Sequence, residues 1–370
     1  MSPLRIGVNA LYLIPGGVGG TEIYLRNLLQ ALAEIDATNE YVLFTNRETG
    51  LGLRPGAPNF RTVQHDVRAS FRPARILWEQ TGLPLAIARQ HLDVLLNPGF
   101  TAPLLCGCPQ VTVFHDLQHK RHPEYFRWFD LPFWRFLLFW SAHLSRSLIA
   151  DSDATRADLM EFYRLPREKI QVVPLGVEPE FFEIARARRP GPFLLSVSTL
   201  HPHKNLHRLL RAFARFRQAR PDFRLIVAGL RGFEAENLER LQQELGLSGA
   251  VEFTGWIPRE DLYALYARAF AFIYPSTFEG FGLPVLEALA AGIPAACSDI
   301  EPLASTAGDA ALRFDPQDDQ ALLDAMTRLF SDHHLRAELS VRGPQRAALF
   351  SWKTTARLTL DALVEAGQSG

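Results

Sequence analysis

Cysteine is scarce in this chain, and charge of neither sign dominates it. The three cysteines among 370 residues are odd in number and too few for a disulfide scaffold, which indicates a reducing compartment, so we expect the cytoplasm. Cys106 and Cys108 could form half of a metal site, but no Cys or His at zinc-finger spacing accompanies them, so ordinary thiols are the preferred interpretation. The 39 basic residues balance 40 acidic ones, so the composition predicts no nucleic-acid partner.

Long apolar runs are also missing. The N-terminal residues lead straight into a strand-like segment at 5–9, without the basic start and long apolar core of a signal peptide. The longest aromatic stretch, 128–140, contains Asp130, Pro132 and Arg135 and is too short to cross a bilayer. We therefore expect a cytoplasmic protein that touches a membrane at most peripherally, at its inner face.

Short apolar runs alternate with amphipathic segments along the chain. In the first half, strands are predicted at 5–9, 41–45, 94–96, 111–114, 147–150 and 170–173, and helices at 21–35, 73–90, 123–145 and 154–163. In the second half, strands are predicted at 193–197, 223–228, 250–253, 270–274 and 295–298, and helices at 205–219, 234–245, 259–267 and 283–291. Because the strands are continuously apolar, they indicate parallel sheets covered by helices on both faces. The predicted fold class is α/β, with two doubly wound domains.

A segment rich in Pro and Gly separates the two halves. Residues 174–192 have the composition of a linker, and the length of the chain suits two domains. We predict a first domain at 1–174 and a second at 175–349. Ser351 is suited to cap a final amphipathic helix, which lies within 350–370.

Two glutamates eight positions apart carry the most information about function. Glu279 lies in a glycine-punctuated loop directly after the apolar run 269–274, and Glu287 lies inside the predicted helix at 283–291. Strand, glycine loop and helix, in this order, present backbone N–H groups and a positive helix end to a phosphate. A carboxylate in the loop could reach a sugar, and one two turns into the helix could hold ribose hydroxyls. This layout predicts a sugar-nucleotide site.

The stretch from Glu279 to Glu287 resembles the E-x7-E element of the retaining glycosyltransferases of family 4. The resemblance implies the GT-B fold, in which two Rossmann-like domains face each other across a cleft and the final helix crosses back to the first domain. It also implies that the second domain binds a nucleoside diphosphate sugar and the first an acceptor, with no separate cofactor. The donor-binding residues of this stretch would be Glu279, Gly280, Phe281, Gly282, Leu283 and Glu287.

Lys204 stands at a helix start just after the predicted strand at 193–197. An ammonium group there can counter the charge of a departing diphosphate, and Lys204 matches the phosphate-binding lysine of the family. We expect Asn205 to cap the helix. Many relatives carry a glycine and an arginine where this chain has Ser198 and Thr199, and a threonine here resembles a mannosyltransferase-like branch. The expected donor is therefore GDP-mannose ahead of UDP-glucose.

The first half contributes a glycine loop and a histidine. Gly17 and Gly19 precede a helix and resemble the family loop that lies under the donor phosphates, although a plain strand-to-helix turn would look similar. His115 and Asp116 follow the strand at 111–114; the histidine can donate to a sugar hydroxyl, and the acid can orient it or cap the loop. A histidine here is by itself more often structural, and it is the resemblance that favours a catalytic role beside Lys204 and Glu279.

Three further residues are weaker candidates. Trp256 and Ile257 follow a predicted strand and resemble the wall that receives the nucleobase, although aromatic residues beside glycine are also common in cores. Glu79 precedes a helical stretch that would line the first domain's cleft, and is an acceptor-side candidate together with Asp116.

Two other patterns have a competing structural interpretation. The Asp151-Ser152-Asp153 triplet could hold a metal, but it lies between a strand and a helix, where Asp and Ser are ordinary N-caps. We therefore expect no metal. The aromatic region at 123–145 could contact a membrane interface or a lipid-linked acceptor, although helices packed in a core look similar from sequence.

Together these features predict a retaining, metal-independent hexosyltransferase of the mannose or glucose type. Its acceptor would be a glycan or a lipid-linked molecule, in cell-surface polysaccharide synthesis. Two alternatives remain open: a non-catalytic subunit that binds a sugar nucleotide for a partner, and a GT-B phosphorylase or epimerase.

Overall fold

A computed structural model describes residues 3–17, 19–126 and 128–368, in two compact units. Unit 1 comprises Met1–Gly176 and Trp352–Gly370, and unit 2 comprises Val177–Ser351. The sequence analysis divides the chain after residues 174 and 349, close to these positions.

Unit 1 is built on a sheet of seven parallel strands in the order β3-β2-β1-β4-β5-β6-β7. The strands are β1 (Arg5–Asn9), β2 (Glu40–Thr45), β3 (Phe60–Gln64), β4 (Val94–Asn97), β5 (Gln110–Phe114), β6 (Ser147–Ala150) and β7 (Ile170–Val172). The helices are α1 (Gly20–Ile35), α2 (Arg72–Gln90), α3 (Gln118–Arg121), α4 (Leu131–Leu144), α5 (Asp153–Tyr163) and α14 (Trp352–Gln368), with short 3-10 turns η1 (Pro123–Tyr125) and η2 (Arg167–Lys169).

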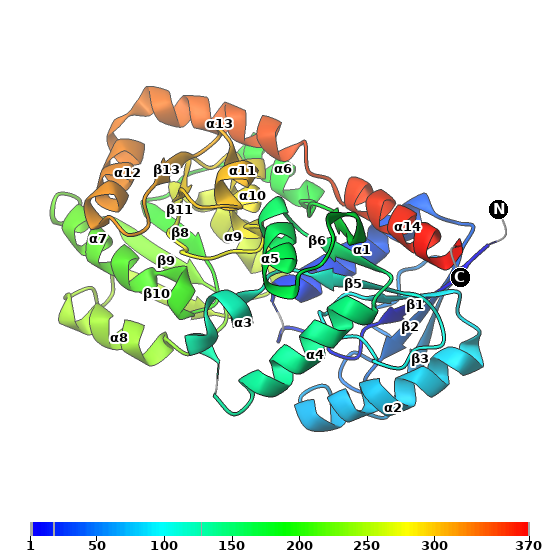
Figure 1. Cartoon of the computed structure of the whole chain (residues 1–370). Helices are drawn as coiled ribbons and strands as arrows, with labels where there is room; N and C mark the ends of the chain where they lie inside the picture. Colours follow the sequence, from blue (N-terminus) through cyan, green and yellow to red (C-terminus); the bar gives the residue numbers. More distant parts are fainter. Residues whose placement is uncertain (1–2, 18, 127, 369–370) are drawn as a thin grey trace. The chain divides into compact units, whose positions relative to one another are not determined.

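The strand order decides which helices share a face of this sheet. The connection through α1 runs from β1 outward to β2, whereas those through α2, α4 and α5 run in the opposite direction across the sheet. Since such crossovers are right-handed, α2, α4 and α5 lie on one face and α1 on the other. The final helix α14 packs along α1 (Figure 1). Thr355 of α14 also donates to the carbonyl of Pro174 at 2.7 Å. The prediction that the last helix returns to the first domain is confirmed.

Unit 2 repeats the architecture with six parallel strands in the order β10-β9-β8-β11-β12-β13. They are β8 (Phe193–Val197), β9 (Arg224–Ala228), β10 (Val251–Gly255), β11 (Ala271–Tyr274), β12 (Ala295–Ser298) and β13 (Leu312–Phe314). The helices are α6 (Pro179–Ala187), α7 (Leu206–Gln218), α8 (Ala235–Glu244), α9 (Arg259–Arg268), α10 (Leu283–Ala290), α11 (Leu303–Ala307), α12 (Asp319–Ser331) and α13 (His333–Ala347), with a 3-10 turn η3 (Pro202–Lys204). The predicted α/β class with two doubly wound sheets is confirmed.

Two predicted segments differ from the structure. The expected linker at 174–192 contains α6, whose Phe181 is fully buried against Tyr263 and Tyr266 of α9. The expected helix at 123–145 begins only at Leu131, because Pro123 and the residues after it form a short 3-10 turn and an irregular loop. The first error comes from Pro and Gly at the edges of the segment, which mask the helix within it, and the second comes from extending the aromatic helical pattern back to Pro123.

Candidate active site

The candidate site in unit 2 lies where the sheet reverses its winding. Strands β8 and β11 are neighbours, but the connection after β8 runs toward β9 and the connection after β11 runs toward β12. Ligands of doubly wound sheets bind outside the carboxyl ends of strands at such a reversal, because the two connections diverge and leave a crevice. Lys204 follows β8 and Glu279 follows β11, so the fold brings together the two residues that the sequence analysis selected.

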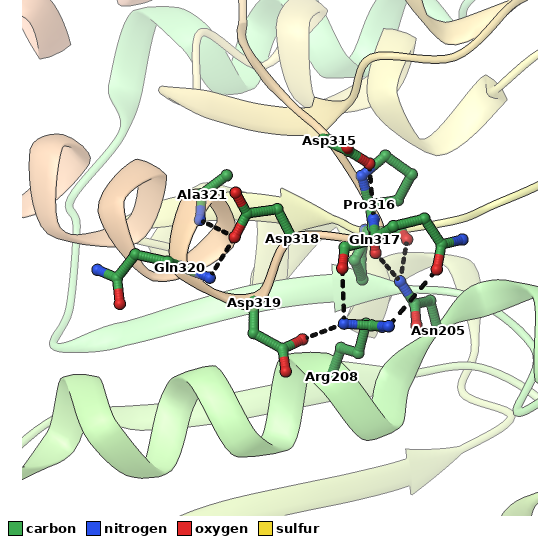
Figure 2. Close-up of polar contacts among 10 residues, drawn as sticks. Asn205, Arg208, Asp315, Pro316, Gln317, Asp318, Asp319, Gln320 and Ala321 are labelled. Carbon is green, nitrogen blue, oxygen red and sulfur yellow. Dashed lines mark hydrogen bonds and ion pairs between the residues drawn. The ribbon is translucent and has the colours of Figure 1, made fainter.

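The loop that carries Lys204 is tied to its neighbours by Asn205. This residue adopts a left-handed conformation with φ of 56°, and its side chain donates to the carbonyls of Pro275, at 3.1 Å, and Pro316, at 2.9 Å. Figure 2 shows the second of these bonds, together with Arg208, which donates to the carbonyl of Gln317 at 2.9 Å. Asn205 therefore stands at the N-cap position of α7 without a side-chain cap bond, and the expectation that it caps the helix is wrong. Its amide joins the loops after β8, β11 and β13.

Lys204 and Glu279 form an ion pair in this structure. The Lys204 ammonium donates to Glu279 Oε1 at 2.5 Å and to the Tyr274 hydroxyl at 3.2 Å. The two side chains are only 14% and 10% exposed, so each charge is largely removed from water and relies on the other. A ligand with an anionic group and hydroxyls could exchange for both halves of the pair.

The loop after Glu279 leads into the N-terminus of α10. Gly282 has φ of 99°, a conformation that requires glycine, and a Cβ there would also displace the Leu303 side chain, whose Cδ2 would lie 2.3 Å away. The Phe281 carbonyl accepts from the Thr306 hydroxyl at 3.0 Å, which holds the loop in place. The N-terminus of α10, where the Leu283 N–H precedes Pro284, is a positive helix end beside this loop.

Glu287 is held in a buried network that the sequence did not reveal. Its side chain is 3% exposed and accepts from Arg259 at 2.6 Å and from the Tyr266 hydroxyl at 2.8 Å. Arg259 also donates to Glu178, from its Nε at 2.8 Å. Burial raises the pKa of Glu287 although Arg259 acts to lower it, and the pKa of Arg259 is raised because Glu287 and Glu178 outweigh its own burial. Two carboxylates thus share one arginine.

The remaining donor-side candidates in unit 2 follow two different strands. Thr199 is half-buried after β8. Trp256 is 58% exposed and Ile257 half-buried, both after β10, which is two strands away from β8. The exposed indole of Trp256 is available to a planar ligand.

His115 of unit 1 has both ring nitrogens engaged. Nδ1 lies 2.7 Å from Asp151 Oδ2, and Nε2 lies 3.0 Å from the Pro98 carbonyl oxygen. Both partners are acceptors, and an imidazolium, which carries a proton on each nitrogen, satisfies both contacts. Burial alone would lower the pKa of His115, but the charge of Asp151 and its hydrogen bond outweigh burial and raise it.

Within the Asp151-Ser152-Asp153 triplet, Ser152 and Asp151 have different structural roles. Ser152 is the N-cap of α5 and its hydroxyl accepts from the Thr155 N–H at 3.1 Å, as the cap interpretation predicts. Asp151 does not cap the helix; it is 2% exposed and binds His115 instead. Among the residues described, no three His, Cys, Asp or Glu side chains are gathered as metal ligands would be.

The other candidates of unit 1 serve mainly local structure. Asp116 Oδ1 accepts from the Gln118 N–H at 2.9 Å, which is the loop-capping alternative. Glu79 is 1% exposed with Arg75 at 3.7 Å, and burial raises its pKa against the effect of Arg75. This places Glu79 inside the unit instead of on a surface.

The glycine loop of unit 1 is open on one side. The Gly17 N–H donates to the Ile14 carbonyl at 2.8 Å, and Gly19 stands at the N-cap of α1. A Cβ at Gly19 would meet no atom within 4 Å among the described residues. The backbone here is therefore free for close approach by a ligand.

The fold is of the GT-B type, as in the solved structures of a sucrose-phosphate synthase and of the glycosyltransferase WaaG. HepE from Anabaena, solved in complex with UDP-glucose, superposes with a TM-score of 0.77 at 18% identity, covering 98% of this chain and 100% of that one. The family model described as Glycosyl transferases group 1 matches residues 177–346, and the model described as Glycosyltransferase Family 4 matches residues 18–181.

Curated relatives agree with these matches. An O-antigen chain mannosyltransferase B of Escherichia coli is 31% identical over 68% of this chain and 69% of the relative. A D-inositol 3-phosphate glycosyltransferase of Corynebacterium urealyticum is 37% identical over 96% of this chain and 94% of the relative. The chain belongs to glycosyltransferase family 4, and its relatives place it near the mannosyltransferase-like branch.

Proposed function

We propose that the chain transfers mannose from GDP-mannose, in preference to glucose from UDP-glucose, with retention of configuration and without a metal or cofactor. The acceptor would be a glycan or lipid-linked molecule of cell-surface polysaccharide synthesis, and the reaction would take place in the cytoplasm. The observation that carries the proposal is the Lys204–Glu279 pair at the reversal of the unit 2 sheet.

Donor binding would exchange the partners of this pair. The diphosphate replaces Glu279 at the Lys204 ammonium, and the sugar hydroxyls replace Lys204 at the Glu279 carboxylate. The sugar hydroxyls are neutral, so Glu279 would then be compensated by hydrogen bonds instead of by a cation, while Lys204 would counter part of the diphosphate charge. As the bond from sugar to phosphate breaks, the growing charge on the leaving group is countered by Lys204 and by the N-terminus of α10.

Retention would follow from attack on the face that the phosphate leaves. In this path a phosphate oxygen removes the acceptor's proton, so no protein nucleophile is needed. His115 is assigned to the sugar, as a fixed positive charge instead of a base, because both of its ring nitrogens already bind acceptors. Glu287 is assigned to the ribose, whose hydroxyls would share its carboxylate with Arg259 and Tyr266.

The choice of mannose has two supports. One is the name of the Escherichia coli relative, a mannosyltransferase, and the other is Thr199, which resembles the mannosyltransferase-like branch. The UDP-glucose bound to HepE supports the second choice of donor.

A donor screen tests the proposal. The chain is incubated with GDP-mannose or UDP-glucose, with a chelator or with added magnesium, and the released nucleotide is measured. Lys204→Ala should lower turnover by about 100-fold to 1,000-fold, the loss typical of removing one group that stabilises developing charge. Lys353→Ala is the matched control, because this lysine is 70% exposed on α14 of unit 1.

The outcomes separate the alternatives. Binding of a sugar nucleotide that no acceptor extract converts would identify a non-catalytic subunit. Release that requires free phosphate, or epimerised donor without transfer, would identify a phosphorylase or an epimerase. Turnover abolished by the chelator would contradict metal independence.

A further inference from the structure

Two of the three cysteines lie close together in the loop between β4 and β5. Cys106 Sγ and Cys108 Sγ are 3.7 Å apart, within reach of a hydrogen bond between a thiol and a sulfur acceptor. The residues that the structure describes bring no third His, Cys, Asp or Glu to the pair as a metal ligand. We call Cys106 and Cys108 the loop dithiol; its chemistry must come from the two sulfur atoms themselves.

The chain around the loop dithiol is fixed on both sides and open in the middle. Before it, the Leu104 N–H donates to Gln80 Oε1 at 2.9 Å, and after it the Pro109 carbonyl accepts from the Leu95 N–H at 2.9 Å. Between these anchors Gly107 is exposed, and a Cβ there would meet no atom of the described residues within 4 Å. The backbone between the two sulfurs is therefore free to adjust, so that they can approach from 3.7 Å to the disulfide bond length of about 2.0 Å.

The loop dithiol and the third cysteine lie in different surroundings. Both side chains of the dithiol are half-buried and pack against the edge of the core cluster that contains Leu83 and Leu95. Cys297 of β12 is fully buried, and burial raises its pKa to about 12. A small reagent in water can therefore reach the dithiol, whereas the thiol of Cys297 is inert.

The two sulfurs of the loop dithiol are not equivalent. The hydrogen bond from the Cys108 thiol lowers the pKa of Cys106, because it stabilises the thiolate form. The same bond and burial raise the pKa of Cys108, and the negative charge of Asp93 acts in the same direction. Because the thiolate is the nucleophile in cysteine chemistry, Cys106 is the sulfur that attacks, and Cys108 is the thiol that lies ready beside it.

We propose that the loop dithiol is a reversible oxidation site for peroxides, closing to a disulfide between Cys106 and Cys108. The Cys106 thiolate attacks one oxygen of hydrogen peroxide; the O–O bond breaks and hydroxide leaves, which gives a sulfenic acid on Cys106. The Cys108 sulfur loses its proton and attacks the Cys106 sulfur; the S–O bond breaks and a second hydroxide leaves. Overall the two thiols give up two electrons and two protons, and the peroxide becomes two water molecules.

The arrangement is that of a redox sensor. A thiol of lowered pKa, reachable from solvent and poised beside a resolving thiol, is the usual form of such sites, and thiol reductants reverse the disulfide by exchange. In the reducing compartment that the cysteine count indicates, the disulfide forms only transiently. The proposal does not depend on the transferase reaction, because no residue assigned to donor or acceptor belongs to the loop at 98–109.

A count of free thiols in the full chain tests the proposal. The folded chain is exposed to a slight excess of hydrogen peroxide at neutral pH, denatured and alkylated, and its intact mass gives the number of labelled cysteines. The count should fall from three to one without a gain of oxygen, and dithiothreitol should restore it. Cys297→Ser is the matched control: the same pair should be lost, so that its count falls from two to none.

Single variants assign the role of each sulfur. In Cys108→Ser the sulfenic acid of Cys106 has no resolving partner, so it should accumulate and react with dimedone, whereas in Cys106→Ser this labelling should be largely lost. Equal dimedone labelling of the two variants would overturn the assignment of Cys106 as the attacking thiol. A thermal melt checks that each variant folds, and the count on the natural chain needs no variant.

Three results on the natural chain would overturn the proposal as a whole. The first is that all three thiols remain free after peroxide treatment. The second is a gain of oxygen without loss of a thiol pair, which would mean that Cys108 does not resolve the sulfenic acid. The third is a disulfide-linked dimer in place of the internal bond.

Discussion

The two units place charged pairs at the carboxyl ends of their sheets in different ways. In unit 2, Lys204 and Glu279 follow neighbouring strands, and the pair joins an ammonium on a flexible stem to one carboxylate. In unit 1, His115 and Asp151 also follow neighbouring strands, but the second ring nitrogen of His115 is bound to the Pro98 carbonyl, so the ring is held by two fixed acceptors. The same strand-loop-helix pattern thus produces an exchangeable pair in one unit and a closed pair in the other.

The difference shows which groups can change partners during a reaction. An ammonium on a flexible stem can leave one oxygen for another at little cost, whereas an imidazolium that bridges two fixed acceptors cannot turn without losing both bonds. The Glu178–Arg259–Glu287 network of unit 2 is closed in the same sense, because Arg259 bridges two acceptors. We therefore expect substitutions of Arg259 and Asp151, which hold Glu287 and His115 in place, to act on stability, and substitutions in the open pair to act on turnover.

The largest effect on stability is expected for Arg259→Ala. This change leaves Glu287 buried without its cation, and breaking a buried pair in this way costs about 3–5 kcal/mol. The loss should be smaller at acidic pH, because protonation of Glu287, whose pKa burial already raises, removes the unpaired charge. Urea unfolding at several pH values measures both effects.

Arg313→Ala is the matched control for Arg259→Ala. Arg313 pairs with Asp299 in the same unit, but both side chains are about half exposed, so the loss should be under about 1 kcal/mol. Equal losses for the two variants, or a loss for Arg259→Ala that does not vary with pH, would show that the network does not bear on stability.

Much of the fold can be predicted from the sequence, because strands buried on both faces read as continuous apolar runs. The exceptions lie at the edges of the sheets, in α6, and in the segment after β12, where no helix was predicted although α11, α12 and α13 lie there. Strand β3 (Phe60–Gln64) is buried only at its first residue, and β13 (Leu312–Phe314) is only three residues long, so neither produces an apolar run. Helix α6 was not predicted because Pro and Gly surround it in the sequence, although its Phe181 is buried in the core.

The candidate site was predictable where backbone order alone brings residues together. Lys204 and Glu279 meet because each follows a strand at the reversal of the sheet, and strand-loop-helix patterns reveal such positions. The partners of Glu287 and His115 were not predictable. Arg259 is 28 positions from Glu287 and Asp151 is 36 from His115, and nothing in local composition says which side chains cross those distances.

A smaller effect, with a characteristic pH dependence, is expected for Asp151→Asn. Because Asp151 raises the pKa of His115 above its usual value of about 6.5, the pair stabilises the native unit fully below that pH, and the contribution is lost as pH rises through the folded-state pKa. In the variant an amide can donate to a neutral ring, and burial then lowers the pKa of His115, so stability should instead fall as the solution becomes acidic.

Urea unfolding between mildly acidic and mildly alkaline pH measures this reversal. At acidic pH, where the imidazolium is favoured, Asp151→Asn should cost about 1.5–3 kcal/mol, the value of a hydrogen bond to a charged group. Asp153→Asn is the control, because this side chain is 78% exposed, and it should change neither the stability nor its dependence on pH appreciably. A variant with the same pH profile as the natural chain would mean that Asp151 does not set the charge of His115.

The smallest effect on stability is expected for Ser152, the helix cap that lies between the two acidic residues of the triplet. Ser152→Ala removes the acceptor for the Thr155 N–H and should cost about 1 kcal/mol, the usual value of an N-cap. It should leave the pH profile of unfolding unchanged, since the serine hydroxyl does not titrate. Thr81→Ala is the control: its hydroxyl bonds the Leu77 carbonyl within a helix of the same unit but caps nothing, so little stability should be lost. If Ser152→Ala lowered turnover while stability stayed unchanged, the triplet would have a chemical role and the cap interpretation would fail.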